Sequence, residues 1–309
     1  MNANKKTLSW QRRSGYKLFL VAIPFLALYF VFSYLPVTGW KYAFYDYKPG
    51  MVLENCEFVG LKNFTVMFQN PVTRREFFQV MKNTLFFGFI GIATSFIPMF
   101  FAIMLNEVKS KRLQKLVQTC TTIPYFISWI LVYAVVYNML STEGFVNTVL
   151  IKLGLISEGV NYMAATSGAR IQMWLYGLWK GLGWNAIIYM ASLGSIDQEL
   201  YEAAAIDGAG RFGKIRYVTI PGLMPTFITL LIMSIGNFLS VGLEQYMVFE
   251  NGFNSKYIQT LDLYVYKQGI FSSNIPFSTA VGIYRSVVGL ILLLFANWLS
   301  GKVRDEKIF

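Results

Sequence analysis

The sequence contains no histidine among its 309 residues. Histidine is the commonest general base in enzymes and the commonest protein ligand of metal ions. Its absence excludes a histidine-ligated zinc hydrolase and any catalytic triad that contains histidine. We therefore expect no catalytic residue and no metal site in this chain.

Charged residues are also scarce, at 14% of the chain, where soluble domains of this size carry about 25%. In their place the chain is 55% hydrophobic and 17% aromatic, with a mean hydropathy of +0.47. This balance indicates lipid as the solvent. The net charge of +11 then indicates basic loops that set membrane orientation, and no nucleic-acid partner is expected. The two cysteines, Cys56 and Cys120, are too few for a disulfide framework.

The chain contains long apolar runs. A helix needs about 20 mostly apolar residues to cross the hydrocarbon core of a membrane. Six stretches qualify, and they predict an all-α polytopic membrane protein with spans near 18–38, 84–106, 118–139, 171–194, 222–243 and 279–299. The first run follows a basic segment, residues 1–17, but is too long for a signal-peptide core, so we interpret it as an uncleaved span.

Lysine and arginine density predicts the orientation. Residues 1–17, 107–117, 195–221 and 300–309 hold about fifteen of these cations in about 65 residues, whereas the opposite loops hold about ten in about 110. The positive-inside rule therefore places both termini and the loop 195–221 in the cytoplasm of a multi-pass cell-membrane protein. The residues from 18 to 299 form one membrane domain, and the outer loop 39–82 is long enough to contain short helices and to contact a partner.

The loop 195–221 contains Gly-Ala-Gly-Arg-Phe-Gly from residue 208, which spells a dinucleotide fingerprint. Such a fingerprint works only after a strand, because a helix N-terminus must receive the pyrophosphate. Strong helix formers precede it here. A phosphate-loop interpretation also fails, because Ile215 follows Lys214 where a hydroxyl is required. We expect no cofactor bound by this chain.

Helix signals give a different interpretation of the same loop. Ser195 and Gln198 match a capping box, which predicts a helix from about Ile196. Asp207-Gly208 should end it, a second short helix should carry residues 211–217, and Pro221 should reset the chain before the fifth span. The alanines leave a small-residue face for another protein, with Glu202, Asp207, Arg211 and Lys214 around it. An interfacial hairpin that packs on the chain's own spans remains an equal alternative.

The spacing of this loop resembles a known family. Glu202-Ala203-Ala204, then Gly208, then Val218-x-Ile220-Pro221 is similar to the EAA signature of inner-membrane permeases of binding-protein-dependent ABC importers. The resemblance extends along nearly the whole chain and is greatest for the complex-oligosaccharide branch of the carbohydrate-uptake-1 group. The phrases that carry it are VGLKNF (59–64), NTL (83–85), IPYFISW (123–129), LWKGLGWNAIIY (178–189) and ELYEAAAIDGAGR (199–211).

The resemblance implies a type I ABC importer permease fold whose EAA loop is a coupling helix. Its docking elements for an ATPase would be Glu202, Ala203, Ala204 and Gly208, and the charges of Asp207 and Arg211 border them. The implied partners are a second homologous permease, two ATPase subunits or an ATPase homodimer, and an extracytoplasmic solute-binding protein. ATP and Mg²⁺ would bind the separate ATPase subunits.

Polar residues inside the spans suggest a substrate path. Tyr176, Lys180 and Trp184 recur every four residues and share one helix face, where aromatic rings could stack on sugars and the cation could meet hydroxyls or a carboxylate. The alternative is that Lys180 bonds to carbonyls of a neighbouring helix.

The fifth and sixth spans carry further polar residues. Ser234, Asn237 and Phe238 form a strip that could line the path or bond between helices. Arg285, near the outer end of the sixth span, is expected to extend outward.

Two other function classes compete with the permease interpretation. An ion-coupled secondary transporter would show inverted repeats with broken helices in matching positions, and no clear repeat is found. A membrane-embedded enzyme would need clustered carboxylates or metal ligands inside the spans. An ABC importer permease for a solute other than a sugar also remains open.

Overall fold

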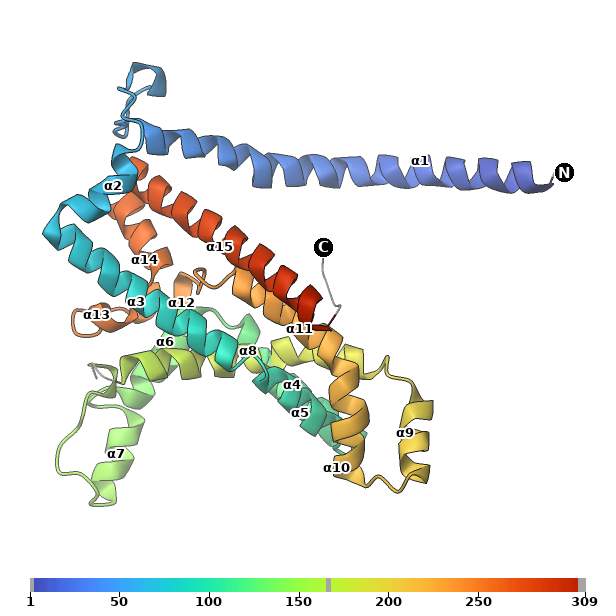
Figure 1. Ribbon diagram of the computed structural model, residues 1–309. Coiled ribbons are helices and arrows are strands. Elements are labelled where there is room, and N and C mark those ends of the chain that lie inside the picture. Colours follow the sequence, from blue (N-terminus) through green and yellow to red (C-terminus); the bar gives the residue numbers. More distant parts are fainter. Residues whose placement is uncertain (1–2, 165–167, 305–309) are drawn as a thin grey trace. The chain divides into compact units, whose positions relative to one another are not determined.

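A computed structural model describes residues 3–164 and 168–304 (Figure 1). Within these residues every regular element is a helix, and only an isolated bridge between Tyr45 and Phe58 pairs two extended backbones. The chain divides into two compact units. The all-α prediction is confirmed.

The first unit comprises residues 3–67 and 268–283. It contains the first predicted span, in which α1 (Ala3–Tyr29) continues through a π-helical turn, η1 (Phe30–Tyr34), into a 3-10 helix, η2 (Leu35–Phe44). After η3 (Leu53–Asn55), the Asn63 amide donates to the carbonyls of Ala43 and Tyr45 at 3.0 and 3.2 Å and holds α2 (Lys62–Gln69) against the end of η2.

The second unit comprises residues 68–267 and 284–304 of the described chain. Its helices, in chain order, are α3 (Pro71–Ala93), α4 (Ile97–Asn106), α5 (Lys111–Phe126), α6 (Trp129–Leu140), α7 (Phe145–Lys152), η4 (Tyr162–Ala164), α8 (Ala169–Leu193), α9 (Gln198–Ile206), α10 (Arg211–Lys214), η5 (Ile215–Thr219), α11 (Ile220–Gly236), α12 (Glu244–Phe249), α13 (Ser255–Ile258), α14 (Leu261–Tyr266) and the last part of α15 (Ile275–Arg304). The turn η6 (Lys267–Phe271) and α15 cross between the two units.

Helix α8 is central to the second unit because it packs against both α4 and α5. The α5 contact is close: a Cβ atom on Gly183 would collide with the backbone of Thr121 and Thr122. On another side, α8 shares an apolar core with α4 and α11 that includes the buried Tyr189 and Leu223. These contacts fix the helices that carry the candidate site.

Five helical segments are long and apolar enough to span a membrane: Tyr16–Phe44, Pro71–Asn106, Trp129–Lys152, Arg211–Gly236 and Ile275–Lys302. The predicted fourth span, 171–194, is the 25-residue helix α8, which is not among these five. Gln172, Lys180 and Asn185 lower its apolar character. The third of the five segments, Trp129–Lys152, shares only residues 129–139 with the predicted third span, 118–139. The count of six spans therefore stays a prediction.

Two predicted spans are interrupted. The run 84–106 bends at residues 94–96, between α3 and α4, where Pro98 lies in the first turn of α4. The run 118–139 is divided at Ile127–Ser128, where α5 ends two residues after Pro124 and the Ser128 hydroxyl caps α6. Proline lacks the N–H that would continue a helical ladder, which explains the bend before Pro98. Pro124 lies within α5, and the second break follows it.

Candidate functional site

The EAA segment forms a short exposed helix, α9, and a turn. Its N-cap is Asp197, whose carboxylate accepts a 3.0 Å bond from the Glu199 N–H, so the prediction that Ser195 caps the helix is wrong. Ser195 instead donates from its hydroxyl to the Ser192 carbonyl. Both side chains can cap a helix, and the chain uses the one directly before its first turn. Helix α9 ends where predicted, because Gly208 adopts a φ of +80° that favours glycine.

The second half of the loop differs from the prediction. Residues from Arg211 to Gly236 form one helical run, in which η5 joins α10 to α11. Pro221 lies in the first turn of α11 and does not reset the chain. Because the run is helical on both sides of Pro221, this proline removes one helical hydrogen bond, and the π-helical turn η5 directly before it accommodates the loss. The loop is therefore connected rigidly to the fifth predicted span.

The residues expected to dock an ATPase gather on α9 and the turn after it. Glu202, Ala203, Asp207 and Gly208 are exposed, and Ala204 is half-buried. Two large apolar side chains stand beside them, since Ile206 is 87% exposed and Phe212 is 83% exposed. Arg211 is exposed as well, and its guanidinium pairs with Glu107 at 2.5 Å. This surface combines charge, small residues and apolar groups that the described chain leaves open.

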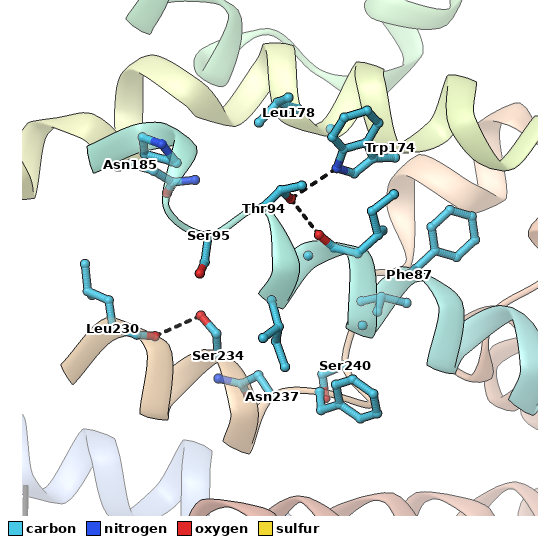
Figure 2. A pocket seen from close by; sticks show the side chains of 18 of the residues that line it. Phe87, Thr94, Ser95, Trp174, Leu178, Asn185, Leu230, Ser234, Asn237 and Ser240 are labelled. Atoms are coloured by element: carbon cyan, nitrogen blue, oxygen red, sulfur yellow. Dashed lines mark hydrogen bonds between the residues drawn. The ribbon is translucent and has the colours of Figure 1, made fainter. Parts of the chain in front are cut away.

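A cavity of about 510 Å³ lies among α3, α4, α8, α11 and α12 (Figure 2). Ser234, Asn237 and Phe238, which the sequence placed on a candidate path, all line it. The Ser234 hydroxyl and the Asn237 amide also donate to carbonyls one turn earlier in α11, at 2.8 and 3.1 Å. Their remaining hydrogen-bonding capacity faces the cavity.

Other polar residues of the lining were not predicted: Thr94, Ser95, Trp174, Asn185, Tyr189, Ser240, Gln245 and Tyr246. Figure 2 shows the Trp174 indole donating to the Thr94 hydroxyl, at 3.3 Å. Trp174 and Asn185 belong to a face of α8 different from that of Tyr176, Lys180 and Trp184. A search for polar residues on every face of the predicted fourth span would have found them.

Residues of α12 also border the cavity. Gln245 donates from its amide to the Met173 carbonyl at 2.6 Å and so attaches α12 to α8. Burial, with a smaller contribution from the Asp262 carboxylate, raises the pKa of Tyr246 above its ordinary value. The cavity therefore presents a neutral phenol, amides and hydroxyls, and the described lining includes no charged side chain.

Tyr176, Lys180 and Trp184 do not line this cavity. The Lys180 ammonium donates to the Tyr125 carbonyl at 2.6 Å and lies over the rings of Tyr125 and Trp129. Trp184 stacks on Tyr125, with ring centroids 4.6 Å apart. This geometry favours the packing alternative for Lys180.

Tyr176 and Arg285 are also engaged within the chain. The Tyr176 ring packs against Phe249 of α12. Arg285, expected to extend outward, forms an ion pair with Asp262 of α14. The Asp262 carboxylate also accepts from the Gly242 N–H at 3.0 Å, so it connects the segment after α11 with α15.

Comparisons with known proteins agree with the resemblance. The model of the family "Binding-protein-dependent transport system inner membrane component" matches residues 94–305. Protein LplB of Bacillus subtilis (strain 168) is 35% identical, over 98% of this chain and 95% of LplB. The polygalacturonan/rhamnogalacturonan transport system permease protein YteP of the same organism is also 35% identical, over 94% of this chain and 90% of YteP.

A solved structure resembles the fold. It is a chain of a bacterial alginate ABC transporter in complex with an alginate pentasaccharide-bound periplasmic protein. The two chains are 30% identical and superpose with a TM-score of 0.84, over 97% of this chain and 99% of that one.

Proposed function

This chain belongs to the family of inner membrane components of binding-protein-dependent transport systems, and we propose that it is the permease subunit of an ATP-driven oligosaccharide importer. It would form part of the translocation path for a sugar delivered by a solute-binding protein. A second, homologous permease would complete the path. The names of YteP and of the alginate transporter support a sugar as the solute class.

One observation carries the proposal. A single helical run begins at Arg211, after the turn that follows the exposed EAA helix, and ends at Gly236, where Ser234 and Asn237 line the cavity. A movement imposed on α9 would therefore reach the cavity through continuous helix. ATP hydrolysis itself would take place in separate ATPase subunits on the cytoplasmic side, where both termini would also lie.

The cavity lining suits a sugar. Amide and hydroxyl groups can donate to and accept from ring hydroxyls. The aromatic faces of Trp174 and Phe238 supply apolar contact beside them. We place Ser234, Asn237 and Phe238 on the substrate path, whereas Tyr176, Lys180 and Trp184 would act by positioning the helices around it.

Cysteine cross-linking tests the docking surface. Ala204→Cys, in a background with Cys56→Ser and Cys120→Ser, should cross-link to an ATPase subunit in the assembled complex. A matched cysteine at Lys152, exposed on α7 in a predicted outer loop, should not. If Ala204→Cys gives no cross-link while the complex remains assembled, the proposed docking role is wrong.

Substitutions in the cavity test the path. In cells or proteoliposomes supplied with solute-binding protein, Asn237→Leu should lower the uptake of a labelled oligosaccharide panel derived from pectin and alginate. The ATPase subunits should still copurify with this variant, because Asn237 is remote from α9. Uptake that depends on an ion gradient and not on ATP would contradict the proposal as a whole.

A further inference from the structure

We propose that the contact between Arg211 and Glu107 is a positioning contact, which makes α4 move together with the Arg211–Gly236 run when the ATPase subunits close. This inference rests on the proposed function, because it describes how a movement of α9 would reach the second wall of the cavity. Neither residue is expected to touch the sugar or ATP.

The contact joins residues that are 104 positions apart in the sequence. Arg211 Nε donates to Glu107 Oε2 at 2.5 Å, and Arg211 Nη2 donates to the Glu107 backbone carbonyl at 3.2 Å. The guanidinium thus binds both the side chain and the main chain of Glu107. A lysine ammonium lacks the planar fork that allows two such directed bonds.

The positions of the two residues in their helices favour the contact. Glu107 is the C-cap of α4, and its N–H donates to the Ile103 carbonyl. Arg211 is the first residue of α10. A cation is favourable beside the C-terminus of a helix, and a carboxylate is favourable near an N-terminus. The contact therefore connects the end of α4 with the start of the run that leads to α11.

The exposure of the pair limits its contribution to folding. The Arg211 side chain is 63% exposed and that of Glu107 is 27% exposed, and ion pairs in such settings contribute little to stability. Variants of the pair should therefore fold and assemble. The role of the pair in positioning the helices can then be measured separately from its contribution to stability.

The contact matters because the two helices that it joins line different sides of the cavity. Thr94 and Ser95, directly before α4, and Pro98 within it line one side of the cavity, whereas Ser234 and Asn237 of α11 line another. Helix α9 itself packs on α10 and η5, and the Tyr201 hydroxyl lies 3.0 Å from that of Thr219 in η5. A movement of α9 would thus shift the Arg211–Gly236 run first, and the contact between Arg211 and Glu107 would then shift α4.

Spin-label distances test this coupling. Phe100→Cys on α4 and Thr229→Cys on α11, both at exposed positions, would be labelled in a Cys56→Ser, Cys120→Ser chain assembled with its partner subunits in nanodiscs. ATP with vanadate serves as the probe, so the sugar need not be known. In the otherwise unchanged complex, the distance distribution should be the same before and after trapping, because the helices move together.

Loss of the pair should separate the two movements. In Arg211→Gln and in Glu107→Gln, trapping should shift or broaden the distribution, and ATP-driven uptake should fall about threefold to fivefold. The exchanged pair Glu107→Arg with Arg211→Glu restores the opposite charges at the two helix ends but not the bond to the carbonyl of residue 107, so it should restore the original behaviour in part. Lys115→Gln is the matched control, because it removes an exposed cation from α5 for which the described residues show no ion pair.

The outcomes separate the inference from the proposed function. If Arg211→Gln shows the same distances as the unchanged pair after trapping, the positioning role is wrong. It is also wrong if the exchanged pair brings the distances no closer to those of the unchanged pair than Arg211→Gln does. If the chain with its native pair does not assemble with an ATPase, the proposed function fails, and with it the role of the pair.

Discussion

Lys180 donates a 2.6 Å hydrogen bond from its ammonium to the backbone carbonyl of Tyr125, close to the break between α5 and α6. The break leaves helix carbonyls without their usual partners, and such groups are costly inside a membrane. The Lys180 side chain is only 9% exposed, so the bond compensates both a buried cation and a carbonyl at the end of α5. The lysine therefore holds the interrupted span against α8.

Replacing Lys180 with methionine should destabilise the protein by about 1–2 kcal/mol, because the bond to a charged donor is lost while the cost of burying the charge is relieved in part. The measurement is the thermal unfolding midpoint of the purified complex. Lys152→Met on the exposed helix α7 is the control and should leave the midpoint unchanged. Reduced uptake with an unaltered midpoint would instead indicate that Lys180 contacts the solute.

Asn83 connects α3 to the segment around α13. Its amide donates to the carbonyls of Lys256 and Gln259, both at 3.0 Å, and its side-chain oxygen accepts from Arg170 at 2.7 Å. Asn83→Ala would remove the bonds to the Gln259 carbonyl and from Arg170, at a cost of about 1–3 kcal/mol, while the Lys256 carbonyl keeps its 3.0 Å bond from Gln79. We expect the segment to loosen, so that trypsin cleaves after the exposed Lys256 several times faster than in the unchanged chain.

The control for this experiment is Asn138→Ala, because the exposed Asn138 amide donates only within its own helix, to the Ala134 carbonyl. Its cleavage rate should match that of the unchanged chain. Equal rates in Asn83→Ala would show that other contacts, such as the 2.8 Å bond from the Leu261 N–H to the Thr84 hydroxyl, suffice to hold the segment.

Tyr201 and Thr219 share a contact that fixes α9 on the helical run. Tyr201→Phe and Thr219→Val should each lower the free energy of unfolding by about 0.5–1.5 kcal/mol, because each removes the same hydroxyl–hydroxyl bond. The double variant should then be no less stable than the worse single variant. Denaturation of the four proteins measures this coupling, and strictly additive losses would contradict a direct bond.

Much of the helical framework could be predicted, because long apolar runs leave a membrane chain few other structures. The interruptions could not. Pro98 and Pro124 both lie inside predicted spans, and a proline in a span can be absorbed or can accompany a break in the helix. Pro221 shows the first outcome, within the run from Arg211, and Pro124 the second. Tertiary contacts decide between them.

The candidate site could be predicted only in part. Ser234 and Asn237 stand out as polar residues in an apolar run, and both line the cavity. Lys180 stands out equally, yet it faces Tyr125. The sequence gives the spacing of residues around a helix but not which face meets a neighbour, so the path-facing and packing-facing residues of α8 could not be distinguished. Thr94 and Ser95 were missed because they lie in a bend inside the apolar run 84–106, whose composition does not indicate a bend.

Gly183 marks the closest approach of α8 to α5, and it supports a final prediction. A Cβ atom there would collide with the Thr121 carbonyl and lie 2.6 Å from the Thr122 nitrogen, and both are backbone atoms that no side-chain rotation can move. Gly183→Ala should therefore separate the helices and cost about 1–3 kcal/mol of unfolding free energy. Gly91→Ala in α3 is the matched control, since its Cβ would meet no atom within 4 Å, and alanine there should stabilise the helix slightly.

The separation of α8 from α5 in Gly183→Ala would also lengthen the Lys180–Tyr125 bond. Adding Lys180→Met to Gly183→Ala should therefore cost less unfolding free energy than Lys180→Met costs in the unchanged chain. A full additional loss in the double variant would show that the two contacts hold α5 independently.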